Sequence, residues 1–207
     1  MTSFVVKAFL TLFVVIDPIG LTPIFITLAG DRPAKEQSRI SRQAVLVAGC
    51  IVFAFALGGT LLLRYLGISI EAFEVAAGIL LFKIAIDMVF AQRERETDEE
   101  EKEARLREDI SIFPLAIPLI AGPGTLASVL ILANEAEGYS FGLTIVLAIA
   151  AIVLAIAYIL LRLSRYLAKI LGQTGINVVT RVLGVLLSAL AVQYIANGAV
   201  GLLKVNV

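Results

Sequence analysis

The chain has 207 residues and a formal net charge of zero, with 59% hydrophobic and 16% charged residues. Soluble proteins average about 45–50% apolar and about 25% charged residues, so this composition excludes an ordinary soluble domain and predicts an integral membrane protein. The balanced charge gives no indication of a nucleic-acid partner. With no histidine and one cysteine, Cys50, the chain lacks the usual metal-ligand, hydrolytic and redox motifs. We therefore expect no enzyme, no bound metal and no cofactor.

Six apolar stretches follow one another along the chain, at residues 3–29, 44–63, 72–90, 112–133, 141–161 and 176–203. Each approaches the roughly 20 residues that a helix needs to cross a bilayer. Backbone groups in a bilayer must be hydrogen-bonded within the protein, and the alternating pattern of a transmembrane barrel is absent. The sequence therefore predicts an all-α integral membrane protein with six transmembrane segments. A signal peptide is disfavoured, because the first stretch has no basic leader and is interrupted by Asp17 and Pro18.

Basic residues are unevenly distributed between the segments that connect these spans. Twelve lie in the first, third and fifth connecting segments: Arg32, Lys35, Arg39, Arg42, Arg93, Arg95, Lys102, Arg105, Arg107, Arg162, Arg165 and Lys169. Only three, Lys7, Arg64 and Lys204, lie on the opposite side. Because positively charged segments stay in the cytoplasm, both termini are predicted to lie outside it.

Two of the spans are interrupted at corresponding positions. When residues 10–29 are aligned with residues 115–134, Pro18 falls on Pro123, and Gly20 and Gly124 lie just beyond. Farther along, GILL at residues 78–81 matches GVLL at residues 184–187. We therefore predict two three-helix repeats, residues 1–92 and 111–207, joined by a charged cytoplasmic connector, residues 93–110. Because each repeat has an odd number of spans, the two would have inverted topology, as in many secondary transporters.

The interruptions at residues 17–20 and 122–124 are predicted to divide spans 1 and 4 into half-helices. Proline removes a hydrogen-bond donor and clashes with the preceding turn, and glycine relaxes the backbone. The freed carbonyls can hold a cation or an ammonium group, and the N-terminus of the next half-helix can hold an anion. Paired breaks of this kind indicate a substrate site near the middle of the membrane. The alternative is a pair of structural kinks that neighbouring helices fill.

The candidate substrate-binding residues lie at the breaks and in the first turns after them. They are Asp17, Pro18, Gly20, Thr22, Gly122, Pro123, Gly124, Thr125 and Ser128. A charged side chain at the depth of Asp17 costs roughly 2.5–3.5 kcal/mol on insertion scales, so it needs a reason. Asp17 is predicted to be a counter-ion for a substrate ammonium or a proton carrier; alternatively, it caps the half-helix that follows. The three hydroxyl residues could cap the half-helices or contact the substrate.

Three further ionisable residues lie within predicted spans. Lys83 and Asp87 are four residues apart on span 3, a spacing that allows an ion pair on one helix face. We interpret them as a structural pair inside the membrane. Arg181 lies at a similar depth on span 6, where it could join this pair or close an inner gate.

The two interrupted segments read IDPIGLTPIF at residues 16–25 and PLAIPLIAGPGT at residues 114–125. Together they closely resemble the paired signatures of the MarC/SnatA family of prokaryotic inner-membrane proteins, and the resemblance covers the whole chain. It implies six spans in two inverted halves. For members with an assigned activity, it implies transport of small neutral amino acids such as alanine and glycine. Leu21 departs from the pattern, because many relatives have asparagine there, so a polar ligand role of that position is lost.

From the breaks and this resemblance we expect a secondary transporter of small zwitterionic amino acids, coupled to the proton gradient. A channel that uses the same breaks as a selectivity filter is the alternative, and coupling of uptake to a proton gradient distinguishes the two. The expected partners are the substrate, protons and membrane lipid. The sequence leaves open the direction of transport and whether the chain forms a homo-oligomer.

Overall fold

The computed structural model describes residues 1–90 and 110–205, and every regular element in this part of the chain is a helix. The helices are α1 (Thr2–Ile16), α2 (Leu21–Ala29), α3 (Ala34–Leu66), α4 (Ile70–Phe90), η1 (Ser111–Ile120), α6 (Pro123–Glu135), η2 (Ala136–Gly138), α7 (Gly142–Arg162) and α8 (Ser164–Val205). The predicted all-α fold is confirmed. α8 bends at Gly172, whose φ of 62° interrupts the helical backbone. Of the predicted connector, residues 93–110, all but the last residue lie outside the described residues.

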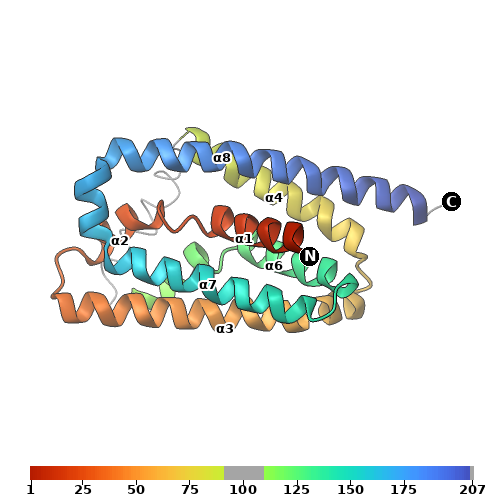
Figure 1. Ribbon diagram of the computed structural model, residues 1–207, viewed down its shortest axis with the longest axis horizontal. Coiled ribbons are helices and arrows are strands. Elements are labelled where there is room, and N and C mark those ends of the chain that lie inside the picture. Colours follow the sequence, from red (N-terminus) through yellow and green to blue (C-terminus); the bar gives the residue numbers. More distant parts are fainter. Residues whose placement is uncertain (91–109, 206–207) are drawn as a thin grey trace.

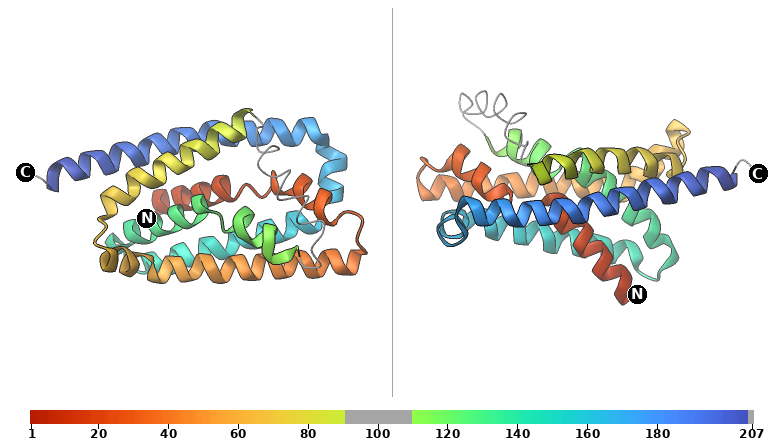
Figure 2. Two further views of the ribbon diagram at one scale, coloured as in Figure 1. Left: turned by 180° about the vertical axis from the view of Figure 1, so that it is seen from behind. Right: turned by 90° about the horizontal axis from the view of Figure 1, so that it is seen from above.

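The interrupted segments occupy the centre of the fold. Figures 1 and 2 show α3 and α7 side by side along one flank and α4 and α8 along the opposite flank, with α1–α2 and η1–α6 between the two pairs. The central segments supply many of the largest buried side chains, including Leu12, Ile16, Phe25, Leu115 and Leu130. Protein thus covers Asp17, Pro18 and Gly20 of the first break, as a bilayer requires, whereas Ile117 in the irregular part of η1 is 42% exposed.

The flanking helices expose apolar side chains on their outer faces, for example Leu57 of α3, Phe82 of α4, Ile152 of α7 and Val185 of α8. Such a surface suits contact with lipid. Four segments are long and apolar enough to cross a membrane, and the bent pair η1 and α6, with an angle of 53°, makes a fifth if it forms one broken span. α4 corresponds to the third predicted span, residues 72–90, which contains Glu74, Lys83 and Asp87 and is not among these segments. Six spans therefore stay a prediction.

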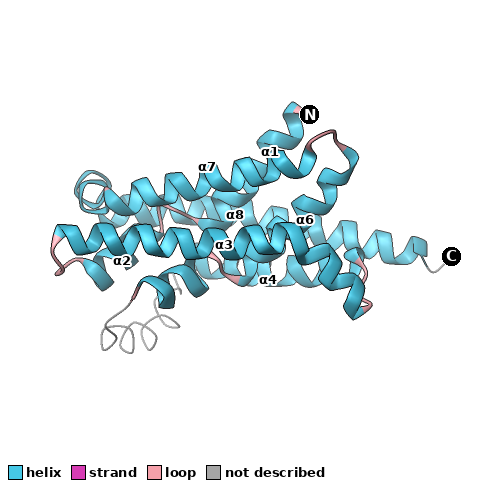
Figure 3. Ribbon diagram, turned by 90° about the horizontal axis from the view of Figure 1, so that it is seen from below, coloured by secondary structure: helices cyan, strands magenta, loops and turns pink. Residues whose placement is uncertain are grey.

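The two ends of the bundle differ in what they carry. Both chain termini lie toward one end, here called the terminal end, and the α2–α3 and α7–α8 turns lie at the other, the loop end (Figures 1 and 3). At the loop end Arg162 donates to the hydroxyl of Ser38, and Arg165 donates to the carbonyl of Gly30. The first and fifth connecting segments thus meet on one side, as the sequence predicts. That this side is cytoplasmic is still the prediction from the basic residues.

Glycines bring α4 and α8 into close contact. A Cβ atom at Gly78 of α4 would lie 2.7 Å from the carbonyl oxygen of Ala191, and one at Gly184 of α8 would lie 3.1 Å from that of Ala85. Small residues allow transmembrane helices to approach at backbone distance in this way. The two matched sequences, GILL and GVLL, therefore both begin at the α4–α8 contact.

Candidate functional site

The first break is a short turn between α1 and α2 that is organised around Asp17. Asp17 ends α1 in the left-handed conformation, with φ 46° and ψ 63°, which aspartate tolerates better than most residues. Its side chain is fully buried, and Oδ1 accepts a hydrogen bond of 3.1 Å from the backbone N–H of Gly20. A Cβ atom at Gly20 would overlap this carboxylate, so glycine is needed there. The carboxylate thus closes the turn between the two helices, and within the described residues no side chain caps the N-terminus of α2.

The N–H groups that open α2 are all hydrogen-bonded. After Gly20, the N–H of Leu21 donates to the carbonyl of Asp17 and that of Thr22 to the carbonyl of Ile19, both at 3.1 Å. The Thr22 hydroxyl also donates to the Ile19 carbonyl, at 2.7 Å. The N-terminus of α2 is therefore satisfied by its own turn and offers no open donor among these three groups.

Carbonyl groups, in contrast, are freed at the first break. Pro18 has no N–H to reach the carbonyl of Val14, and Gly20 donates to the Asp17 carboxylate in place of the carbonyl of Ile16. No backbone donor within the described residues reaches either carbonyl. Together with the carboxylate, they give the first break a negative polarity that suits a cation or an ammonium group.

The second break begins earlier than the sequence predicts. η1 is interrupted by extended backbone at Phe113 (φ −124°, ψ 127°) and Ile117 (φ −129°, ψ 126°). Each precedes a proline, Pro114 or Pro118, and proline disfavours the helical conformation of the residue before it. These two prolines are the sequence signal for the wider irregularity. The predicted interruption at residues 122–124 is the end of this irregular segment.

The second break ends at an open helix N-terminus. Gly122 is extended, with φ −75° and ψ 171°, and Pro123 is the first residue of α6, a position that suits proline. Within the described residues, no acceptor reaches the N–H groups of Gly124 and Thr125, and no side chain caps α6. The Thr125 hydroxyl donates across the break to the carbonyl of Ile120, at 2.9 Å. The second break therefore presents unpaired donors at the positive end of the α6 dipole.

The two breaks lie side by side. A Cβ atom at Gly124 would lie 3.3 Å from Cγ1 of Val15, in the last turn of α1, and 3.1 Å and 2.9 Å from side-chain carbons of Leu81 and Ile84 in α4. One turn farther along α6, Ser128 is fully buried, and its hydroxyl has no hydrogen-bond partner in the described part of the chain. A buried hydroxyl normally has a hydrogen-bond partner, so the Ser128 hydroxyl marks a position where a ligand or a water molecule can bind.

The other predicted charged residues lie apart from the breaks. Lys83 and Asp87 form the ion pair that their spacing predicts, with 3.3 Å between Nζ and Oδ2. The Lys83 side chain is 60% exposed, so the pair lies on the outer surface of α4. Arg181 is also exposed, and within the described residues it makes no ion pair with Asp87. Within the described residues, Arg181 therefore does not join this ion pair.

A further polar cluster, which sequence reasoning missed, lies between the breaks and the terminal end. Lys7 of α1 places Nζ 2.6 Å and 2.7 Å from the two carboxylate oxygens of Glu135 in α6. Glu74 of α4 interacts electrostatically with both residues. Tyr194 of α8 is fully buried beside Thr11, and its hydroxyl makes no hydrogen bond of normal geometry within the described residues. We call these five residues the terminal polar cluster.

The sequence signal for this cluster is helical spacing. Lys7 and Thr11 are four residues apart on α1, and Ser128 and Glu135 are seven apart on α6, so each pair shares a helix face. Helical spacing does not show, however, that the face of α1 and the face of α6 lie against each other. Among the described residues, no group of three His, Cys, Asp or Glu side chains is arranged to hold a metal ion.

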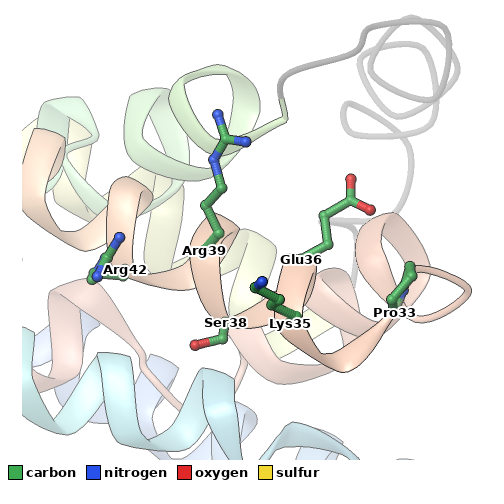
Figure 4. Close-up of a pocket in the computed structure, with 6 residues that line it drawn as sticks. All are labelled: Pro33, Lys35, Glu36, Ser38, Arg39 and Arg42. Atoms are coloured by element: carbon green, nitrogen blue, oxygen red, sulfur yellow. The ribbon is translucent and has the colours of Figure 1, made fainter.

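A cavity of about 620 Å³ lies at the loop end, at the start of α3. Figure 4 shows the side chains that line it, which are Pro33, Lys35, Glu36, Ser38, Arg39 and Arg42. Arg32, just before α3, forms an ion pair of 2.6 Å with Glu36. The cavity includes none of the predicted substrate residues, and its basic lining is what a cytoplasmic membrane surface favours.

The family of the chain follows from comparison with known proteins. No solved structure matches it. A membrane protein of Methanocaldococcus jannaschii, UPF0056 membrane protein MJ1677, is 38% identical over 97% of this chain and 98% of its own length. UPF0056 membrane protein YvbG of Bacillus subtilis is 37% identical over 99% and 98%, and YhcE of Escherichia coli is 34% identical over 95% and 92%. The family model for MarC family integral membrane proteins matches residues 2–203, so the chain, with its two adjacent breaks, belongs to the MarC family.

Proposed function

We propose that this protein is a secondary transporter of small neutral amino acids, such as alanine and glycine, coupled to the proton gradient. The observation that carries the proposal is the opposite polarity of the two adjacent breaks. The first offers the Asp17 carboxylate and freed carbonyls, and the second offers unpaired N–H groups and a helix dipole. A zwitterion that enters a medium of low dielectric constant needs both of its charges compensated.

In this proposal the two charges of the amino acid bind to different repeats. The substrate carboxylate accepts hydrogen bonds from the N–H groups of Gly124 and Thr125, as anions do at helix N-termini. The ammonium group lies near Asp17 and the carbonyls of Val14 and Ile16. The buried hydroxyl of Ser128 is available to either the carboxylate or a bound water.

The pairing of the helices supports the inverted repeat on which this mechanism depends. The second helix of each proposed repeat pairs with the other, α3 with α7, and the third helices pair likewise, α4 with α8. The contacts Gly78–Ala191 and Gly184–Ala85 are related by one constant offset between the halves. A two-fold relation between inverted repeats produces such reciprocal contacts, and alternating access in these folds moves one part against another around the central site.

The size of the substrate follows from the space around Gly124. Side chains of Val15, Leu81 and Ile84 already come within 3.3 Å of the position that a Cβ atom would take there. A tryptophan or arginine side chain beside Gly124 would displace these groups much farther than a hydrogen or a methyl group would. We therefore expect bulky amino acids to compete poorly with alanine.

The test is uptake of radiolabelled alanine by reconstituted protein and by the variant Asp17→Asn, with and without an imposed pH gradient. Asparagine keeps the shape and the oxygen that accepts the Gly20 N–H, and it caps about as well as aspartate. The substitution therefore removes only the negative charge of Asp17. We expect normal folding, measured by thermal unfolding in detergent, and loss of uptake or of its pH dependence.

Asp31→Asn is the matched control, because Asp31 is exposed at the loop end and the change in charge is the same. Wild-type uptake by Asp17→Asn with an unchanged pH profile would leave Asp17 as a structural cap only. Uptake that does not respond to the pH gradient in the wild-type protein would instead indicate a channel.

A further inference from the structure

The Lys7–Glu135 ion pair joins the two proposed repeats at the terminal end. Both carboxylate oxygens of Glu135 contact the Lys7 ammonium, at 2.6 Å and 2.7 Å, and Glu74 adds a second negative charge nearby. The side chains are 39% and 25% exposed, so solvent reaches the pair. The structure therefore contains a primary ammonium group held by carboxylates at the end of the central segments.

This pair continues toward the breaks as a line of polar groups. Beneath it lie Thr11, which is 3% exposed, and Tyr194, which is fully buried with an unpaired hydroxyl among the described residues. On α6, Ser128 continues the face that carries Glu135 and leads to Thr125. Lys7 and Glu135 are each ten residues from their break residues, Asp17 and Thr125, or about 15 Å at the helical rise. The ion pair is thus separate from the central site but aligned with it.

We propose that Glu135, assisted by Glu74, forms an outer binding site for the ammonium group of the transported amino acid, and that Lys7 occupies this site until the substrate displaces it. The proposal rests on the proposed function for the identity of the substrate. Lys7 is a tethered primary ammonium, the same chemical group that an amino acid carries, so the bonds it makes to Glu135 are those that a substrate can make. The buried hydroxyls of Tyr194 and Thr11 lie next on the way to the breaks.

Two facts favour a binding site over a purely structural ion pair. The Lys7 and Glu135 side chains are only part-buried, so water can replace part of the contact when Lys7 leaves Glu135. A structural pair also gives no reason for an unpaired tyrosine hydroxyl that is fully buried beneath it, since buried polar groups are usually satisfied. A route for a polar substrate accounts for both.

The test compares the KM for alanine in vesicles whose terminal end faces the added substrate. Lys7→Met keeps the length of the side chain and removes the competing charge. We expect KM to fall by about two-fold or more, because the substrate ammonium no longer has to displace Lys7. Glu135→Gln removes the site, and we expect KM to rise by at least as much. The charge exchange Lys7→Glu with Glu135→Lys rebuilds an ion pair, and KM should stay high.

A structural ion pair predicts a different pattern: both single variants would lose activity in the same direction, and the charge exchange would restore it. Either result would overturn the proposal. Lys204→Met and Glu137→Gln are the matched controls, because both residues are exposed near the terminal end and carry the same charges. KM should be unchanged in both.

A binding measurement separates this proposal from the transport function. Ethylammonium should raise the thermal unfolding temperature of Lys7→Met, propionate should not, and the additional change Glu135→Gln should abolish the effect. If the wild-type protein transports no amino acid but this ethylammonium effect is found, the transport function fails and the outer site stands. If alanine uptake is normal and ethylammonium binding does not depend on Glu135, the outer site is wrong and the transport function stands.

Discussion

The two breaks have matching sequences but opposite electrostatic character. In the first, a carboxylate precedes the proline and accepts the N–H of Gly20, and backbone carbonyls of the same turn accept the N–H groups of Leu21 and Thr22. In the second, the corresponding position is Gly122, which has no side chain to do this, and the start of α6 keeps its N–H groups open. The difference in polarity therefore comes from the Asp17 carboxylate together with the tight turn at residues 17–20.

The aligned prolines also act differently in the two breaks. Pro18 is buried in the turn before α2, where its missing N–H frees the carbonyl of Val14. Pro123 is exposed and opens α6, where a missing N–H has no effect on the helix. The comparison shows that the residue type fixes where a helix is interrupted, whereas its position in the turn decides which backbone groups become available.

The largest effect is expected from filling the open break. Gly124→Val would place methyl groups against Val15, Leu81 and Ile84, beside the proposed carboxylate site. Overpacking of this kind costs about 1–3 kcal/mol, and a loss of 1.4 kcal/mol in binding is about ten-fold. We expect alanine uptake to fall by about ten-fold or more. Gly138→Ala is the control, since nothing lies within 4 Å of a Cβ atom there. Normal uptake by Gly124→Val would show that the second break is not the anion site.

The next largest effect is expected from displacing the Asp17 carboxylate, which closes the first break. Gly20 has φ −67° and ψ −20°, a backbone that alanine adopts freely, so Gly20→Ala changes only the contact with Asp17. Displacing the carboxylate from the buried N–H should lower the free energy of unfolding by about 1–3 kcal/mol. Thermal unfolding in detergent measures this effect. In an Asp17→Ala background the same change should cost much less, and simple additivity of the two variants would contradict the assigned hydrogen bond.

A smaller effect is expected from the unpaired hydroxyl next to the second break. Ser128→Ala removes a group that makes no hydrogen bond within the described residues, so stability should not fall. If Ser128 binds the substrate or its water, KM for alanine should rise a few-fold. Ser41→Ala is the control, and we expect it to lower stability and leave KM unchanged. The buried Ser41 hydroxyl donates to the carbonyl of Ser38 at 3.2 Å, and this hydrogen bond is lost. An unchanged KM in Ser128→Ala would restrict the site to backbone groups.

The smallest effect is expected from the ion pair on the surface of α4. The double variant Lys83→Gln with Asp87→Asn removes both charges from a pair that lies away from the breaks. Because exposed pairs contribute up to about 1 kcal/mol, we expect uptake within about two-fold of the wild type. Uptake assays on the double variant and on each single variant measure this. A loss of uptake would assign these residues to a gate and would show that the breaks alone do not define the mechanism.

Local sequence features were sufficient for the helices and for the places where they are interrupted. Apolar composition predicts membrane helices because no water is available to their backbone, and Pro18 and Pro123 interrupt helices through their own covalent structure. The Lys83–Asp87 pair also follows from helical spacing alone. Pro114 and Pro118 are an equally local signal, and they place the start of the second irregular segment earlier than residues 122–124.

The tertiary structure decided which groups at the breaks are open and which side chains meet. Whether Asp17 faces Gly20, whether Gly124 lies against Val15, and whether Ser128 finds a partner depend on how helices from distant parts of the chain pack. Lys7 and Glu135 are 128 residues apart, and no local preference relates them. The sequence by itself therefore determined the membrane class, the first break and the end of the second, because these depend on short-range sterics and hydrophobicity. The polarity of each break and the terminal polar cluster exist only in the packed structure, because electrostatic and hydrogen-bonding partners are chosen by contacts between helices.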